Sequence, residues 1–93
     1  MALNVIKKDG TKEPFNPEKI KNSIAAAAQR TDLPEERKNE VIEQVANAAI
    51  QMAGEKEEIA TSEIKEKILS DLDQIEPKVS EAWRKYDQEQ KGA

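Results

Sequence analysis

The sequence contains no cysteine and no histidine among its 93 residues. These two absences exclude disulfides, thiol or imidazole catalysis, and zinc sites built from the usual ligands. Aromatic residues are scarce as well, at 3%, so the core has to come from Ile, Val, Leu and Ala. A core of that composition favours helices, and 93 residues suffice for one domain, 1–93, with one modest core.

Long hydrophobic runs are also missing. No apolar stretch approaches the roughly 20 residues that a membrane-spanning helix needs, and the first residues lack the apolar segment of a secretory signal. We therefore expect a cytoplasmic protein with no membrane partner.

Glycine is sparse, and its positions exclude two phosphate-binding loops. Gly10, Gly54 and Gly92 stand alone, so neither the G-x-x-x-x-G-K-[ST] loop nor the G-x-G-x-x-G fingerprint is present. Acidic pairs such as those at 35–36 and 57–58 lie on polar stretches and indicate a solvated surface rather than a catalytic or metal site. No base, nucleophile or metal cluster suggests an enzyme.

Basic residues are fewer than acidic ones, 15 against 19. The net charge of −4 argues against direct binding of nucleic acid, which depends on a basic surface. The first 22 residues nevertheless carry +2, from five lysines against three acids, and leave −6 for the other 71. A small anion would be drawn to this first quarter of the chain.

Helix start signals and apolar spacing predict four helices. Asn16-Pro17-Glu18 combines an N-cap, a proline at the first helical position and an acid in the first turn, and similar signals occur at 32–35 and 61–63. Residues 71–77 break the pattern, and a fourth helix should follow from Lys78. Ile, Val, Leu, Ala and Met recur at helical spacing in the first three: Ile20, Ile24, Ala27 and Ala28; Val41, Val45, Ala48, Ala49 and Met52; Ile64, Ile68, Leu69 and Leu72.

Short strands should precede the first and third helices. Asp9-Gly10 is a favoured pair for a two-residue hairpin turn, and Pro14 should lie at a strand end or on an edge strand. Ile59 could belong to a third strand near 57–60. The predicted fold is α+β and mostly α: a four-helix bundle capped by a small three-stranded sheet, with 88–93 as a frayed tail.

Lysines flank the predicted hairpin and offer a phosphate site. Lys7 and Lys8 precede the turn, Lys12 follows it, and Lys19 lies in the first turn of the next helix, where backbone N–H groups add donors. Taken alone, the pattern is more typical of lysines that keep a short sheet edge soluble.

Hydroxyls and aromatic rings also allow two interpretations. Thr61 and Ser62 could cap the third helix or bind a ligand, and capping is the more common role. Trp83 and Tyr86 could stack on a base, but in a chain with so few rings they are expected to anchor the core, as is Phe15.

The run from Val5 to Ile20, VIKKDGTKEPFNPEKI, resembles the opening signature of the ATP-cone domain, V-x-K-[RK]-[DN]-G followed by an N-cap and K-I. The segment 58–64 resembles the family's second landmark, and Trp83 and Tyr86 fit its closing aromatic pair. ATP-cones are regulatory domains of ribonucleotide reductases and of the zinc-ribbon repressor of reductase genes. The resemblance implies a helical bundle with a three-stranded sheet and a site for ATP or dATP, with or without Mg²⁺.

The resemblance also implies a set of ligand contacts. A backbone contact is expected at Val5, phosphate contacts at Lys7 and Lys19, and base contacts at Glu13 and Asn16. Thr61 should face the site from the third helix, and Lys8 and Lys65 complete the predicted set: Val5, Lys7, Lys8, Glu13, Asn16, Lys19, Thr61 and Lys65.

Two positions depart from the family pattern. Lys65 stands where some reductase cones place a histidine, and Asp87-Gln88 stands where a basic residue is usual. An acid there should weaken triphosphate binding. We expect a regulatory module without enzymatic activity that binds an adenine nucleotide and acts on a larger protein or on a second copy of itself. The alternative is a helical interaction module that has lost its nucleotide.

Overall fold

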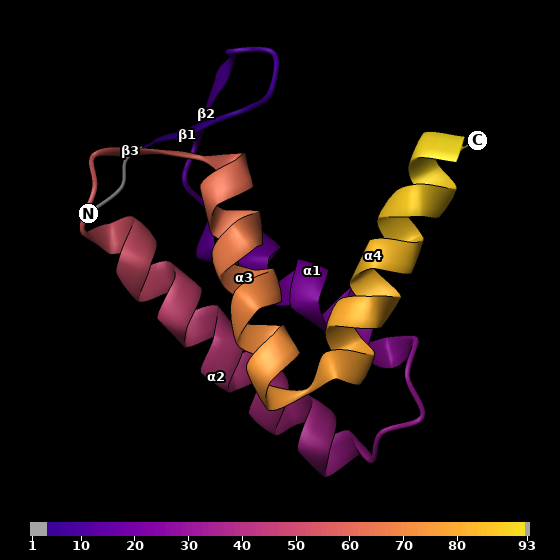
Figure 1. Ribbon diagram of the computed structural model, residues 1–93. Helices are drawn as coiled ribbons and strands as arrows, with labels where there is room; N and C mark the ends of the chain where they lie inside the picture. Colours follow the sequence, from indigo (N-terminus) through magenta and orange to yellow (C-terminus); the bar gives the residue numbers. More distant parts are fainter. Residues whose placement is uncertain (1–3, 93) are drawn as a thin grey trace.

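The computed structural model describes residues 4–92, which form a helical bundle with a small sheet at one end (Figure 1). The fold is α+β and mostly α, as the sequence predicts. The elements follow in the order β1 (Asn4–Ile6), β2 (Lys12–Pro14), α1 (Pro17–Gln29), α2 (Glu35–Gly54), β3 (Glu58–Ala60), α3 (Thr61–Ile75) and α4 (Pro77–Gly92).

The sheet has the strand order β2-β1-β3 and is mixed. β1 pairs with β2 antiparallel and with β3 parallel, so that Val5 lies between Glu13 and Ile59. Pro14 ends the edge strand β2, as predicted, because an edge strand tolerates a residue that cannot donate to the ladder. Ile59 is 1% exposed and fastens the sheet to the core of the bundle.

The hairpin loop is longer than the predicted two-residue turn. Ile6 pairs with Lys12, and the Lys7 N–H donates to the Thr11 carbonyl at 2.9 Å, which leaves three residues in the loop. Gly10 closes it with φ +87°, the left-handed conformation that this type of loop requires at its last position. The Asp9 carboxylate accepts hydrogen bonds from the Thr11 N–H and hydroxyl and so braces the turn.

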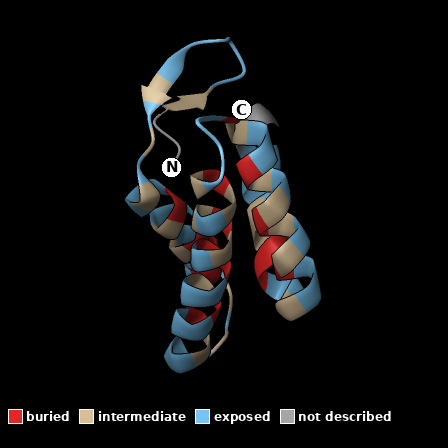
Figure 2. Cartoon of the chain, turned by 90° about the vertical axis from the view of Figure 1, so that its left-hand side faces the viewer, coloured by how far each residue is buried: buried red, intermediate tan, exposed pale blue. Residues whose placement is uncertain are grey.

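Ile, Val, Leu and Ala form the core, to which α1, α2 and α3 contribute most and α4 contributes Val79; Figure 2 shows the buried positions along the helices. The predicted apolar face of α1 is buried at all four positions, and the Asn16 side chain caps this helix by accepting from the Glu18 N–H. In α2 the buried stripe includes Ala46 and Ala53 in place of Ala48 and Met52, which are only half-buried. α2 begins at Glu35, although its cap residue is Pro34 and no side chain bonds there.

The predicted break at 71–77 is confined to one residue. α3 continues to Ile75 with Leu72 fully buried, and only Glu76 leaves the helical conformation, with φ −152° and ψ 84°. Pro77 explains this, because a residue before proline is driven to extended backbone while proline itself suits the first position of a helix.

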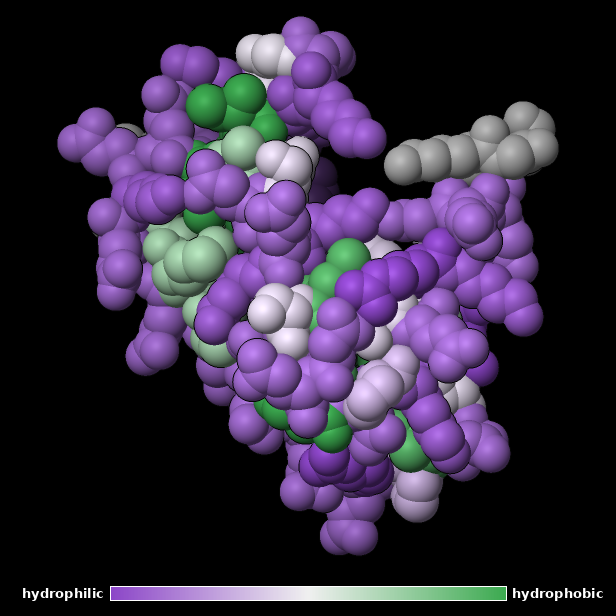
Figure 3. Space-filling model, viewed as in Figure 1, coloured by the Kyte–Doolittle hydropathy of each residue, from purple (hydrophilic) through white to green (hydrophobic). Residues whose placement is uncertain are grey.

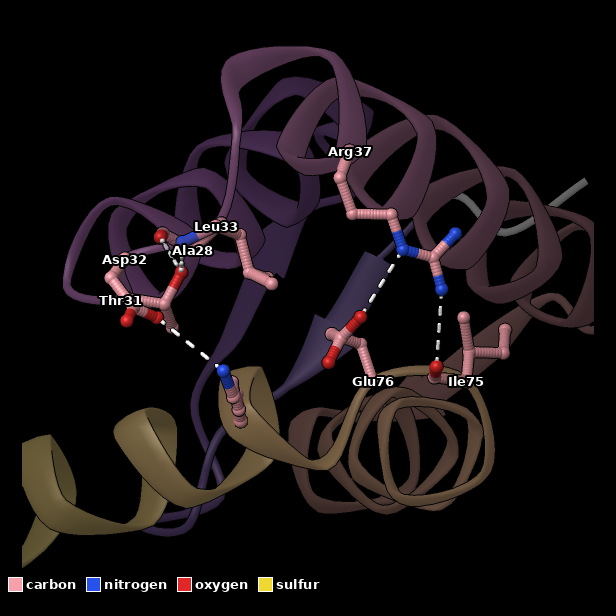
Figure 4. Close-up of polar contacts among 8 residues, drawn as sticks. Ala28, Thr31, Asp32, Leu33, Arg37, Ile75 and Glu76 are labelled. Carbon is pink, nitrogen blue, oxygen red and sulfur yellow. Dashed lines mark hydrogen bonds and ion pairs between the residues drawn. The ribbon is translucent and has the colours of Figure 1, made fainter.

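Arg37 on α2 fixes this corner in place (Figure 4). Its Nε donates to the Glu76 carboxylate at 3.1 Å, and a terminal nitrogen donates to the Ile75 carbonyl at 3.2 Å. The second bond satisfies a carbonyl at the end of α3 that has no partner within the helix. Two residues after Glu76, Lys78 of α4 pairs with Asp32 at 3.5 Å.

α4 packs on α1 and α3 and carries both late aromatic residues. Trp83 packs against the core, but Tyr86 is 48% exposed, so its prediction as a core anchor is wrong. The Arg30 guanidinium instead lies over the Tyr86 ring, with 5.4 Å between the guanidinium carbon and the ring centroid. Helical structure continues to Gly92, and the fraying of 88–93 in solution stays a prediction.

The molecular surface is mostly hydrophilic on the face shown in Figure 3, with small separate apolar patches. Within residues 4–92, no helix is both long and apolar enough to cross a membrane.

Leu72→Ala should lower the free energy of unfolding by about 2 to 5 kcal/mol, because Leu72 is 0% exposed and the loss leaves a cavity at the centre of the core. Glu66→Ala on the exposed side of the same helix is the control and should change stability by less than about 0.5 kcal/mol. Urea unfolding followed by circular dichroism measures both. Equal effects would contradict this placement of the core.

Candidate functional site

A cavity of about 190 Å³ opens where the sheet meets the starts of α1 and α3. β1 and β2 form one wall, α1 and α3 supply the others, and Trp83 of α4 closes it from below the sheet. Six of the eight sequence-predicted site residues line this cavity: Val5, Glu13, Asn16, Lys19, Thr61 and Lys65.

The lining divides into an apolar floor and a polar rim. The floor comes from aliphatic and aromatic side chains: Val5, Phe15, Ile20, Ile64, Ile68 and Trp83. Polar groups are few and converge from three elements, which is the usual composition of a site for a small organic ligand.

Glu13 holds two lysines together at the rim. One carboxylate oxygen is 2.7 Å from Lys7 Nζ and the other is 3.5 Å from Lys19 Nζ. The hydrogen bond and charge of Lys7, with Lys19 beside it, hold the pKa of Glu13 below its ordinary value, and Glu13 in turn raises the pKa of Lys7. Both lysines predicted to meet phosphates are therefore already gathered around one anion, the Glu13 carboxylate.

Thr61 is not the cap of α3. It is the first residue of the helix, Ala60 occupies the cap position, and no side chain bonds the free N–H groups there. The capping interpretation of Thr61 and Ser62 is therefore wrong, because a cap must precede the helix and these residues are already inside it. The start of α3 offers the cavity the Thr61 hydroxyl, N–H groups that no side chain caps, and the positive end of the helix dipole.

Lys65 follows Thr61 by one turn, so both face the cavity from α3. Its ammonium forms an ion pair with the Asp87 carboxylate on α4. The two residues that depart from the family pattern are thus paired with each other, at half-buried positions with 38% and 29% of their side chains exposed.

Two of the eight predicted residues do not line the cavity, and the contact predicted for Val5 is not tested. Lys7 does not line it and reaches it only through Glu13, and Lys8 is exposed on the hairpin loop. Val5 lies on the central strand, with a neighbouring strand on each side of its backbone. Its predicted backbone contact with a ligand stays a prediction.

A second hollow of about 460 Å³ adjoins the cavity between α1 and α4. Ser23 and Trp83 line both spaces. Arg30, Tyr86 and Asp87 also line this second hollow.

Sequence reasoning did not assign Ser23 or, apart from Val5, the apolar residues of the lining to the site, and two of these residues are instructive. Ser23 follows Lys19 by four positions, and its hydroxyl donates to the Lys19 carbonyl at 2.8 Å, so helical spacing alone could have placed it at the site. Trp83 was expected to be a core anchor, and it packs against the core while also lining the cavity. Its second role depends on where α4 lies, which periodicity does not reveal.

Comparison with known proteins matches residues 3–91 to the ATP cone domain family. The chain is similar to the transcriptional repressor NrdR of Lactobacillus delbrueckii subsp. bulgaricus, with 40% identity over 74 residues, and to those of Synechococcus sp., with 36% over 75, and Chloroflexus aggregans, with 32% over 78. These matches cover 80%, 81% and 81% of the chain but only 46%, 46% and 44% of the relatives.

The relatives contradict one expectation from the sequence, namely that this protein does not bind nucleic acid directly. They are transcriptional repressors, a class of protein that acts on DNA. The charge argument failed because a net charge of −4 describes these 93 residues alone, and the chain spans under half the length of the curated relatives it matches.

Lys7→Met should raise the pKa of Glu13 toward its ordinary value of 4.5, since the Lys7 hydrogen bond is the largest cause of the depression. Lys19→Met, the matched control, should raise it less. Because the folded pKa lies below the unfolded one, the interaction stabilises the fold above about pH 4.5 and is lost as pH falls through the folded pKa. The ¹³C shift of the Glu13 carboxyl, followed over a pH titration, measures this. A Glu13 pKa unchanged in Lys7→Met would contradict the ion pair.

Proposed function

The chain belongs to the ATP-cone domain family, and on that premise we propose that its cavity binds ATP or dATP and that binding regulates a partner protein. The observation that carries this proposal is the convergence of ligand residues. Six positions that the family resemblance assigns to the nucleotide come from β1, β2, α1 and α3, yet they line a single cavity.

The size of the cavity suggests how much of the ligand it takes. Small-molecule sites usually enclose ~300–1,000 Å³, whereas this cavity holds about 190 Å³. The base is therefore expected inside, and the phosphates are expected across the rim, where the ammonium groups lie.

The floor suits an adenine ring. Phe15 and Trp83 offer ring faces or edges, and Ile64 offers aliphatic contact, all half-buried or buried against the core. Asn16 is placed to bond the base with its remaining amide groups, since its side-chain oxygen already accepts from the Glu18 N–H.

The rim suits a chain of phosphates. Lys7 and Lys19 are held together by Glu13, and a phosphate could replace that carboxylate as their shared anion. The start of α3 adds N–H groups that no side chain caps and the Thr61 hydroxyl. Mg²⁺ would accompany the nucleotide through its phosphate oxygens.

The names of the relatives support the proposal that the module regulates a partner. They are named as transcriptional repressors and are about twice as long as the matched region. We propose that the module senses nucleotide on behalf of a larger assembly, either a separate protein or further copies of this chain. The module would have no enzymatic activity of its own, and it would work in the cytoplasm, where bacterial transcription takes place.

Lys19→Met should weaken ATP binding about three- to tenfold, because it removes one ammonium from the phosphate rim while leaving the cavity floor intact. Lys21→Met is the matched control: it lies on the same helix, carries the same charge and pairs with Glu43 of α2 outside the cavity. Fluorescence of Trp83, the single tryptophan, reports binding because its ring lines the cavity.

The wild-type titration decides between the proposed function and its alternative. If millimolar ATP and dATP left both the Trp83 emission and the amide NMR spectrum of the wild type unchanged, the nucleotide proposal would be lost. An interaction module without ligand would then be favoured. Equal affinities of Lys19→Met and Lys21→Met would reject the placement of the phosphates.

A further inference from the structure

The Lys65 ammonium of α3, at the cavity, is already paired with a carboxylate of the protein, that of Asp87. Lys65 lines the cavity and Asp87 lines the neighbouring hollow, so their ion pair joins a residue of one space to a residue of the other. Trp83 precedes Asp87 by one helical turn and lines both spaces from the same face of α4.

A phosphate on Lys65 would meet the Asp87 carboxylate. Two anions on one ammonium would lie about 5 Å apart, and like charges at that distance repel strongly in a partly buried site. With 38% and 29% of their side chains exposed, Lys65 and Asp87 are shielded enough for this repulsion to matter and open enough for the pair to exchange.

We infer that Asp87 competes with the ligand's phosphates for Lys65 and thereby sets the affinity of the site for phosphorylated ligands. This inference rests on the proposed function, because it concerns a nucleotide in the same cavity. In the free protein Asp87 holds Lys65. In the bound protein a phosphate forms the ion pair with Lys65, and the Asp87 side chain moves away from Lys65.

A second ion pair between the same two helices makes a matched control possible. Asp73 of α3 accepts two hydrogen bonds from Arg84 of α4, each at 2.8 Å, and neither residue lines the cavity. Loss of this pair removes a link between α3 and α4 without changing any charge at the cavity. A gain in affinity that came merely from loosened helices would therefore appear in both variants.

The experiment compares Asp87→Asn, Asp73→Asn, Lys65→Met and the double variant Lys65→Met with Asp87→Asn in the full chain. Trp83 fluorescence is titrated with ATP and with adenosine, which has no phosphate. Asp87→Asn should bind ATP about threefold more tightly than the wild type and should bind adenosine equally well. Asp73→Asn should match the wild type for both ligands.

The double variant separates competition for Lys65 from a general charge effect. On the Lys65→Met background, Asp87→Asn should give no gain for ATP, because the contested ammonium is gone. Three outcomes would overturn the inference and leave the proposed function standing. The gain in ATP affinity could persist on the Lys65→Met background, it could also appear in Asp73→Asn or with adenosine, or Asp87→Asn could give no gain although the wild type binds ATP. If neither the wild type nor Asp87→Asn responds to millimolar ATP, the proposed function falls with it.

Discussion

The strand order β2-β1-β3 is the constraint from which the site follows. β2 leads directly into α1 and β3 into α3, so the two helices begin on opposite sides of one central strand. Two strand spacings amount to about 10 Å, which is close enough for the first turns of both helices to face one cavity. Ile59 holds this arrangement on the bundle, because its buried side chain connects the sheet to the core.

The charges at the cavity are mostly compensated within the chain. Glu13 pairs with both Lys7 and Lys19, and Asp87 pairs with Lys65, so that two carboxylates face three ammonium groups. A free protein with these lysines unpaired would concentrate positive charge around a small space. Binding of a polyphosphate therefore amounts to an exchange of protein carboxylates for ligand phosphates. Such an exchange would couple ligand binding to α4, because Asp87 lies on α4. Through α4 the site could influence a partner protein.

Sequence reasoning was strongest where local chemistry determines structure. Asn16-Pro17 starts α1 at the predicted residue, and the predicted apolar face of that helix is buried in full. Pro14 ends an edge strand for the predicted reason. The segment 5–20, which holds most of the cavity residues, was assigned to a ligand by the family resemblance, because local signals alone favoured a solvated sheet edge there.

Features that depend on remote parts of the chain were predicted less well. The pairing of Lys65 with Asp87 and the exposure of Tyr86 both follow from the direction of α4, which the corner at Glu76 and its contact with Arg37 determine. No local pattern encodes that direction. The hairpin loop was predicted one residue too short, because Asp9-Gly10 suits both a two-residue turn and the end of a three-residue loop.

The central claim is that one cavity, formed where the sheet meets α1 and α3, binds the nucleotide. A crystal structure of the chain grown with ATP tests it most directly. The account predicts the adenine against Phe15 and Trp83, with the phosphates at Lys19 and the start of α3. A nucleotide bound elsewhere, with Glu13 still joined to Lys7 and the cavity unfilled, would contradict it.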